Sequence, residues 1–165
     1  MPNWKITVDE AKDVAHMIKI IICNETESDR NEILKLVSKA VAGSNMMIHE
    51  IEMCGELSFL SEDHTYIRLR SRDIFYFEYV NRKIKIVTDQ VVYICIGEKI
   101  GELADKMKKY GFLMSHRSFV VNVHKIERMT SQSLVMKNGD KVYLAQKRVS
   151  LIRKELRSQG VKILL

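Results

Sequence analysis

The sequence predicts a mainly β domain of about 100 residues, preceded by a small α/β segment. From Glu62 onward, short β-branched and aromatic runs alternate with turn residues, as in a β-meander. Before Gly55, a β-branched run, a helical apolar pattern and a second β-branched run follow one another in the order strand, helix, strand. The domain boundary is expected between Gly55 and Asp63, which divides the chain into residues 1–61 and 62–165.

The first segment is expected to hold two helices and two strands. Thr7 and Glu10 have the spacing of a capping box and predict a short helix there. The run at 18–23 predicts a buried strand, and the apolar pattern that follows ends at Gly43, as a helix does. The expected elements are a helix over 7–15, a strand over 18–23, a helix over 26–42 and a strand over 46–51.

The second segment is expected to form strands joined by short turns, together with two helices. Gly111 is expected to end the first of these helices with a positive φ. Asn138-Gly139 predicts a hairpin whose type I′ turn has both central residues at positive φ. The expected strands cover 66–69, 74–79, 84–87, 91–96, 119–123, 134–137 and 141–144, and the helices cover 98–109 and 147–157.

Charge is distributed unevenly along the chain. Residues 1–61 hold 6 Lys/Arg and 10 Asp/Glu, a net charge of −4, whereas residues 62–165 hold 21 and 11, a net charge of +10. A basic domain beside an acidic segment indicates a polyanion as its partner. The sequence has no Lys/Arg-rich amphipathic helix with a broad apolar face, which is the pattern that would indicate binding to a membrane surface. Nucleic acid is therefore the expected partner.

The cysteines and the hydropathy indicate a cytoplasmic protein. Cys23, Cys54 and Cys95 are odd in number and far apart in apolar sequence, so buried, reduced thiols are expected. No apolar run reaches the roughly 18 residues of a membrane span, and the N-terminus lacks the apolar centre of a signal peptide. We therefore expect no membrane insertion.

Enzyme signatures are absent from the sequence. It has no glycine-rich phosphate loop, no Gly-x-Ser-x-Gly motif and no pair of histidines at metal-ligand spacing. His116 beside Arg117 could take part in acid/base chemistry, but no nucleophile or second carboxylate accompanies them. We expect no catalytic residue, metal or cofactor.

An ordered set of motifs runs through the second segment. It begins with Asp-Ile-Phe-Tyr-Phe-Glu at 73–78 and continues with a short basic loop, a strand pair and a helix. It then has Phe-Leu-Met-Ser at 112–115, His-Arg-Ser-Phe-Val-Val-Asn at 116–122, and the Asn-Gly pair. This set resembles the LytTR DNA-binding domain over about 100 residues. The resemblance implies an almost all-β fold that inserts loops, rather than a recognition helix, into successive major grooves of double-stranded DNA.

The resemblance implies three DNA-contacting segments. They are the loop after the Phe-Glu strand, the segment before the Val-Val-Asn strand, and the turn into the last helix. At these places the sequence has side chains that can contact bases or phosphates. The expected DNA-binding residues are Asn81, Arg82, Lys83, His116, Arg117, Gln146, Lys147 and Arg148.

Residue chemistry favours three of these side chains over the rest. Arg82 and Arg117 on loops can reach guanine O6 and N7, and Lys147 at a helix start suits a phosphate. Many family members have Ser-Arg where this chain has Ala145-Gln146, so the contact at that turn can differ.

Each candidate also has a purely structural interpretation. Arg82 and Lys83 can be solvated hairpin charges, and Arg117 can be the ion-pair partner of a carboxylate such as Glu78. Lys147 and Arg148 can be ordinary helix-surface charges, although a helix N-terminus disfavours cations unless an anion binds there. Asn122 is expected to be structural, with its amide closing a turn, and the phenylalanines at 75, 77, 112 and 119 are expected in the core.

The first segment is similar to the opening of a response-regulator receiver domain. The family's pair of acidic residues after the first strand is replaced here by Asn24-Glu25, so one acid is lost. The DNA-binding pattern begins before a third strand could present a phosphoacceptor Asp, so phosphorylation is not expected. This truncated receiver-like segment could be a remnant, a dimerisation element or an acidic flap over the basic domain.

Two functions follow from these observations. The first is a sequence-specific double-stranded DNA-binding transcription regulator of bacteria that works as a dimer or side-by-side pair on promoter repeats. The alternative is a protein-interaction module in which residues 1–61 pair with another regulator or sensor and titrate it. Single-stranded RNA binding would need exposed aromatics among the basic residues, whereas most aromatics here are expected in the core.

Overall fold

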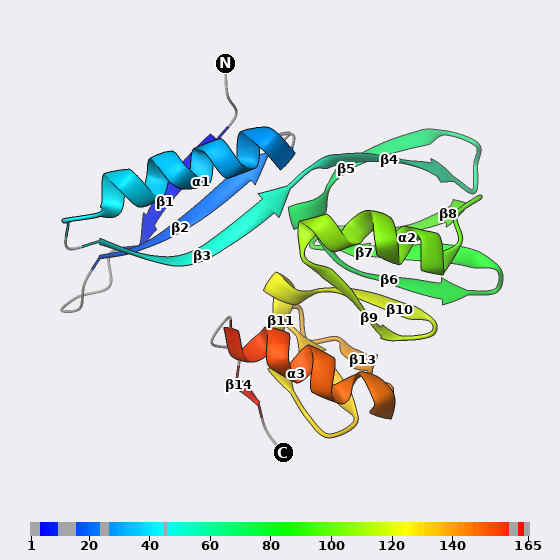
Figure 1. The fold of residues 1–165 in the computed structure, drawn as a ribbon. Helices are drawn as coiled ribbons and strands as arrows, with labels where there is room; N and C mark the ends of the chain where they lie inside the picture. Colours follow the sequence, from blue (N-terminus) through cyan, green and yellow to red (C-terminus); the bar gives the residue numbers. More distant parts are fainter. Residues whose placement is uncertain (1–3, 10–15, 24–26, 45, 159–161, 164–165) are drawn as a thin grey trace. The chain divides into compact units, whose positions relative to one another are not determined.

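The computed structural model describes residues 4–9, 16–23, 27–44, 46–158 and 162–163 (Figure 1). The chain forms two compact units, residues 1–56 and 57–165. The boundary expected between Ser61 and Glu62 lies at the end of β4 (Glu56–Ser61), which pairs with β8 (Val92–Ile96) in the second unit. Strand β4 is therefore part of the second unit's sheet.

In its described residues, the first unit is a three-stranded sheet with one helix. Its strands are β1 (Trp4–Asp9), β2 (His16–Cys23) and β3 (Met46–Cys54), in the order β1-β2-β3. Helix α1 (Glu27–Val41) connects β2 to β3, which run parallel, so the expected order of strand, helix, strand is present. Ile20 and Ile22 of β2 are buried against apolar side chains of α1.

The prediction of a helix over residues 7–15 is wrong for residues 7–9, which the structure describes. Residues Trp4–Asp9 form β1, which pairs antiparallel with β2, with Ile6 opposite Ile20. Pairing along β2 provides partners for the backbone groups of the whole strand, whereas a capping box satisfies only two donors. The β-branched Ile6, Thr7 and Val8 also favour the extended form. Residues 10–15 lie outside the described residues.

The second unit is mainly β, as expected, and is built on a large antiparallel sheet. Seven strands lie in the order β5-β4-β8-β7-β6-β10-β9. Helix α2 (Ile100–Met107) packs against this sheet, and Leu103 and Met107 point into the core. Besides β4 and β8, the strands of this sheet are β5 (Tyr66–Arg70), β6 (Ile74–Val80), β7 (Lys83–Thr88), β9 (Phe112–His116) and β10 (Phe119–Asn122).

A smaller sheet and the last helix complete the unit. The sheet has the order β13-β12-β11-β14, and helix α3 (Val149–Ser158) packs on it through Ile152 and Leu156 (Figure 1). The expected helix over 147–157 therefore begins two residues later, after a single 3₁₀ turn, Gln146–Arg148. The strands are β11 (Ile126–Met129), β12 (Ser133–Met136), β13 (Lys141–Tyr143) and β14 (Lys162–Ile163).

Strand β10 lies between two apolar cores. Val120 packs with α2 and the central strands of the large sheet, whereas Phe119 and Val121 pack with α3 and the small sheet. All four residues of β10 are buried, as expected of a strand covered on both faces. The four phenylalanines at 75, 77, 112 and 119 are buried, which confirms their expected place in the core.

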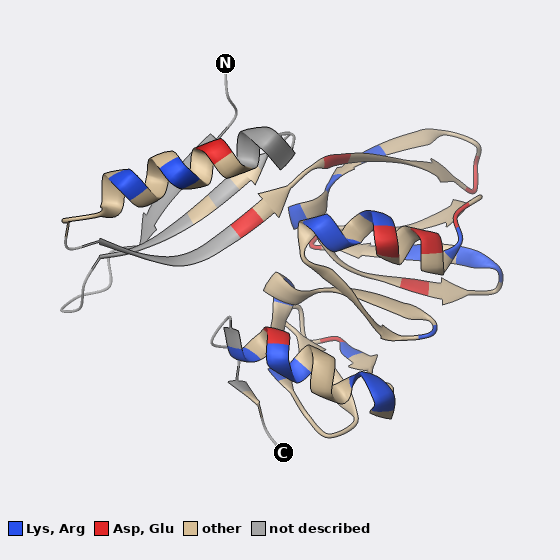
Figure 2. Ribbon diagram, in the orientation of Figure 1, with Lys and Arg blue, Asp and Glu red and all other residues tan. Residues whose placement is uncertain are grey.

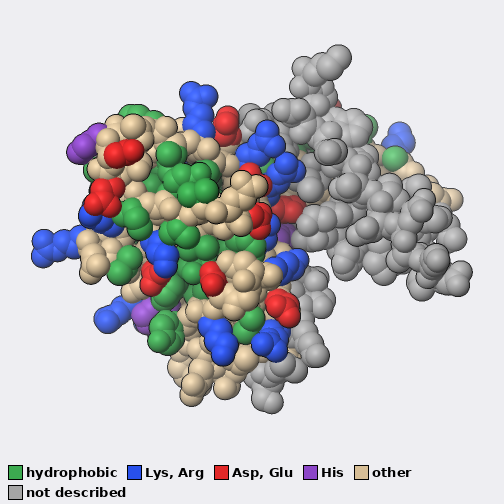
Figure 3. Space-filling model, turned by 180° about the vertical axis from the view of Figure 1, so that it is seen from behind, with side chains coloured by type: hydrophobic (Ala, Val, Ile, Leu, Met, Phe, Trp, Pro, Cys, Tyr) green, Lys and Arg blue, Asp and Glu red, His purple; other side chains and the backbone are tan. Residues whose placement is uncertain are grey.

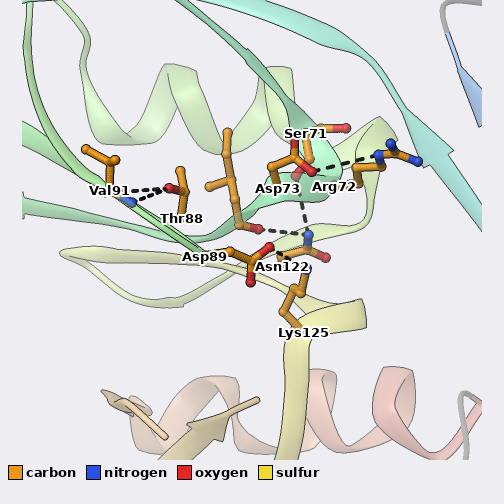
Figure 4. Close-up of polar contacts among 9 residues, drawn as sticks. Ser71, Arg72, Asp73, Thr88, Asp89, Val91, Asn122 and Lys125 are labelled. Carbon is orange, nitrogen blue, oxygen red and sulfur yellow. Dashed lines mark hydrogen bonds and ion pairs between the residues drawn. The ribbon is translucent and has the colours of Figure 1, made fainter. Parts of the chain in front are cut away.

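Asn122 closes the end of β10, and its expected structural role is confirmed. The side chain is 1% exposed. Its Nδ2 donates to the carbonyls of Ile74 (3.0 Å) and Ser71 (3.5 Å), and its Oδ1 accepts from the backbone N–H of His124 (3.1 Å). Figure 4 shows the amide directed at the backbone around Ser71. One side chain thereby joins the start of β6 to the turn after β10.

One turn differs in type from what the sequence predicted. At Asn138-Gly139 the hairpin is present, but Gly139 has φ +88° and Asn138 is not at positive φ, so the predicted type I′ turn is wrong. The Gly139 N–H donates to Met136 O, and Met136 N–H donates to Asp140 O, the pattern of a type I turn followed by a glycine bulge. Gly111 ends the helical segment at φ +79°, as expected.

Two cysteines have the environment that the sequence predicted. Cys54 and Cys95 are buried free thiols, and the side chain of Cys23 lies outside the described residues. Burial, and to a lesser extent the carboxylate of Glu98, raises the pKa of the Cys95 thiol to about 11. Cys95 is therefore protonated near neutral pH.

The substitution Asn122→Ala should lower the free energy of unfolding by about 2–4 kcal/mol. It leaves the Ile74 carbonyl and the His124 N–H without their partner in a buried place. Urea denaturation measures the loss. Gln132→Ala, which removes an exposed amide, should change stability by less than about 0.5 kcal/mol. Equal effects of the two substitutions would contradict the role given to Asn122.

Candidate nucleic-acid interface

Two of the three predicted DNA-binding segments lie at the same edge of the large sheet. Strands β6 and β10 are antiparallel neighbours, with Glu78 opposite Phe119, and the Tyr79 N–H donates to Ser118 O at 2.8 Å. The end of β6 therefore lies beside the start of β10. The β6–β7 turn and the β9–β10 turn open at this edge, which we call the turn edge (Figure 1).

The β6–β7 turn holds Asn81 and Arg82 in left-handed backbone conformations. Their φ values are +51° and +62°, and Val80 pairs with Lys83 across them. This is the two-residue type I′ geometry that matches the twist of the flanking strands. Asn tolerates positive φ readily, whereas Arg does so at a cost of about 1–2 kcal/mol. The exposed Arg82 is thus held by the hairpin in a conformation that it does not prefer.

Lys83 is already paired. Its Nζ lies 2.7 Å from Glu62 Oε1, and both side chains are partly exposed. Glu62 lies in the turn between β4 and β5, far from Lys83 in sequence. The predicted contact at Lys83 is therefore weakened by an acidic neighbour that only the fold brings close.

His116 and Arg117 form the second segment. Arg117 is exposed at the β9–β10 turn, and Glu78, its suggested structural partner, pairs with Lys85 at 3.2 Å instead. His116 Nδ1 accepts the Ser118 N–H at 3.2 Å. Because that nitrogen accepts, the neutral imidazole carries its proton on Nε2, which is the nitrogen able to donate to a ligand.

The third segment, Gln146–Arg148, lies beside the second. The Ala145 N–H donates to Ser115 O at 2.8 Å, and an Arg148 guanidinium nitrogen lies 3.8 Å from Met114 Sδ. Gln146 and Lys147 are exposed, whereas Arg148 is half-buried against β9. Helix α3, which follows, has no acidic residue in its first turn. The positive end of the helix dipole and the two cations therefore act together to favour an anion.

The fold brings the three segments together although they are far apart in sequence. Figure 2 shows Lys and Arg at the β6–β7 turn, at the β9–β10 turn and at the start of α3, all on the right-hand side of the second unit. Seen from behind in Figure 3, Lys and Arg side chains project from the same edge, now on the left. In the part of the chain that the structure describes, the side chains of Arg82, Arg117 and Lys147 have no hydrogen bond or ion pair.

One surface side chain in this region was missed in the sequence. Tyr143 of β13 is 70% exposed, and its ring centroid lies 6.3 Å from that of His116 and 6.1 Å from that of Phe119. The alternation along β13 could have revealed it, because Val142 points into the core and its neighbours point outward. Tyr143 lies between the second and third segments.

Other concave or charged places are less suited to a ligand. A hollow of about 290 Å³ lies near the β7–β8 turn, at the other end of the sheet, but its carboxylates are already paired, Asp73 with Arg72 and Asp89 with Lys125 (Figure 4). Within the described ranges, no three His, Cys, Asp or Glu side chains cluster as metal ligands. None of the described helices combines the length and the apolar character needed to cross a membrane.

Comparison with known proteins places the chain among DNA-binding domains rather than enzymes. The family model for the LytTr DNA-binding domain matches residues 64–157, more than half of the chain. The protein therefore belongs to the LytTR family, whose members are DNA-binding transcription regulators, and the resemblance found in the sequence motifs is confirmed for these residues. The match does not reach residues 1–61, for which the likeness to a receiver stays a prediction.

A solved structure with a similar fold supports the same assignment. It is the LytTr DNA-binding domain of a protein described as a methyl-accepting/DNA response regulator, from Bacillus cereus. The identity is 25% and the TM-score is 0.54, over 61% of this chain and 95% of that one. No curated protein matches the chain.

Removing the partner of Lys83 should strengthen binding to any duplex. In Glu62→Gln, Lys83 loses its competing carboxylate, and the turn edge loses one negative charge. We expect duplex affinity to rise about two- to threefold at low salt and the gain to shrink at high salt. Fluorescence anisotropy at two salt concentrations measures this. Glu127→Gln, which neutralises an exposed acid on β11, is the control, and an equal gain there would rule out a local effect.

Replacing Arg82 by glycine should stabilise the fold and weaken DNA binding. Glycine adopts positive φ without a steric cost, so we expect the free energy of unfolding to rise by about 0.5–1 kcal/mol after its greater entropy in the unfolded chain is counted. Arg82→Ala keeps a Cβ and should bring no such gain. Both variants should lose duplex affinity. Equal stability of the two variants would contradict the strain assigned to this turn.

Proposed function

We propose that this protein is a sequence-specific double-stranded DNA-binding transcription regulator that contacts bases in the major groove through the turn edge. The observation that carries the proposal is the convergence of three basic segments, distant in sequence, on one edge of a rigid sheet. Arg82, Arg117 and Lys147 are exposed there without partners among the described residues. Cations that are unpaired and close together favour a polyanion.

Each segment has its own role in the proposal. Arg82 and Arg117 contact guanine O6 and N7, since turns can carry a guanidinium into the groove. Lys147 holds a phosphate at the start of α3, and Gln146 pairs with an adenine or with the backbone. Asn81 serves mainly to form the type I′ turn. Lys83 and Arg148 contribute charge, because one is paired with Glu62 and the other lies against Met114.

Half-sites arranged as repeats fit this mode of binding. A single domain presents one edge and can span only a short stretch of duplex. We therefore propose that two copies bind side by side or as a dimer on promoter repeats.

Binding-site selection from a random duplex library at about 150 mM salt tests the proposal, because basic proteins bind any DNA when salt is low. The wild-type protein should enrich one motif. The triple variant Arg82→Ala, Arg117→Ala, Lys147→Ala should lose it. A matched variant, Arg68→Ala, Arg70→Ala, Lys108→Ala, removes the same charge from exposed positions elsewhere and should keep the motif. The absence of any motif, or its loss in both variants alike, would sink the proposal.

A further inference from the structure

Tyr143 is an exposed aromatic ring in the middle of the turn edge. It is 70% exposed at the end of β13, two residues before Ala145, whose N–H is bonded to Ser115 of β9. The tyrosine side chain combines a large apolar ring with a polar tip, and tyrosine is therefore enriched at interfaces. Tyr143 lies between the second and third segments, which indicates that the partner bound by these two segments also covers the Tyr143 ring.

The ring is held in place from one side. The His116 and Phe119 rings lie at centroid distances of 6.3 Å and 6.1 Å, tilted by 49° and 51° to that of Tyr143. His116 is itself fixed, because its Nδ1 accepts the Ser118 N–H, and Phe119 is buried in the core. Tyr143 therefore presents a preset apolar surface, backed by two other rings, toward solvent.

The chemistry of duplex DNA limits what such a surface can recognise. Bases in a duplex are stacked, so a ring cannot insert between them without unstacking. The apolar group that the major groove exposes is the C5-methyl of thymine. An apolar ring flanked by Arg117 on one side and Gln146–Arg148 on the other lies where it can cover such a methyl group while these neighbours hold the base edges and the backbone.

We propose that Tyr143, positioned by His116 and Phe119, packs against the C5-methyl of a thymine and thereby specifies thymine at a position between those contacted by Arg117 and by Gln146–Arg148. This inference rests on the proposed function. It adds an apolar specificity contact to an edge whose other contacts are polar.

Uracil substitution provides the test, because uracil differs from thymine only by the absent methyl group. The Kd of the full chain is measured for the selected duplex and for duplexes with each thymine in turn replaced by uracil. For the wild-type protein, one replacement should weaken binding about fourfold, the loss expected for one buried methyl group. In Tyr143→Ala the same replacement should have no effect, so the two changes should not add.

Tyr143→Phe is the matched control, because it keeps the ring and removes the hydroxyl. It should retain the full preference for thymine over uracil. If instead the Phe variant binds thymine and uracil duplexes equally, the hydroxyl and not the ring is responsible for the preference, and the proposal is overturned. Circular dichroism and the thermal midpoint of both variants check that the exposed substitution leaves the fold intact.

The failure of this inference can be told from that of the proposed function. A wild-type protein that selects a motif but shows no methyl effect, or a methyl effect that persists in Tyr143→Ala, keeps the regulator and overturns the thymine contact. A wild-type protein that selects no motif overturns both.

Discussion

The burial of β10 on both faces is the constraint on which the second unit depends. Val120 belongs to the core under α2, and Phe119 and Val121 belong to the core under α3. A strand of four residues thereby joins two layers, as the neighbouring β6 also does through Tyr76 and Phe77, and Asn122 fixes the end of β10 through three hydrogen bonds. Burial of apolar surface on both faces of this strand stabilises the packing of the two sheets against each other.

The same packing determines where the basic residues lie. The start of β10 lies beside the end of β6. The turn that precedes β10 and the turn that follows β6 must therefore lie at the same edge of the sheet. The small sheet is anchored to β9 by the bond from Ala145 to Ser115, which places the start of α3 at that edge as well. The convergence of basic residues at this edge is therefore a consequence of strand order and not of any local sequence cluster.

Local sequence patterns predicted most of the second unit but few of its long-range contacts. Most of the strands, Gly111 and Asn122 could be predicted, because apolar periodicity and turn chemistry act over a few residues. The short strands β4, β9 and β11 were not predicted. The pairing of Lys83 with Glu62 and the contact of Tyr143 with His116 could not be predicted, since each depends on strands that meet only in the folded chain. In the first unit, pairing with β2 outweighs the capping signal near Thr7, a tertiary effect that propensity does not contain.

The shortness of the turns at the edge has a thermodynamic consequence. A two-residue type I′ turn and a tight β9–β10 turn leave their backbones almost no conformational freedom, so binding DNA requires little further ordering of the main chain. The entropy lost on binding is then mainly that of the arginine and lysine side chains. Association should proceed without a slow folding step, at a rate governed by diffusion and by electrostatic attraction to the duplex.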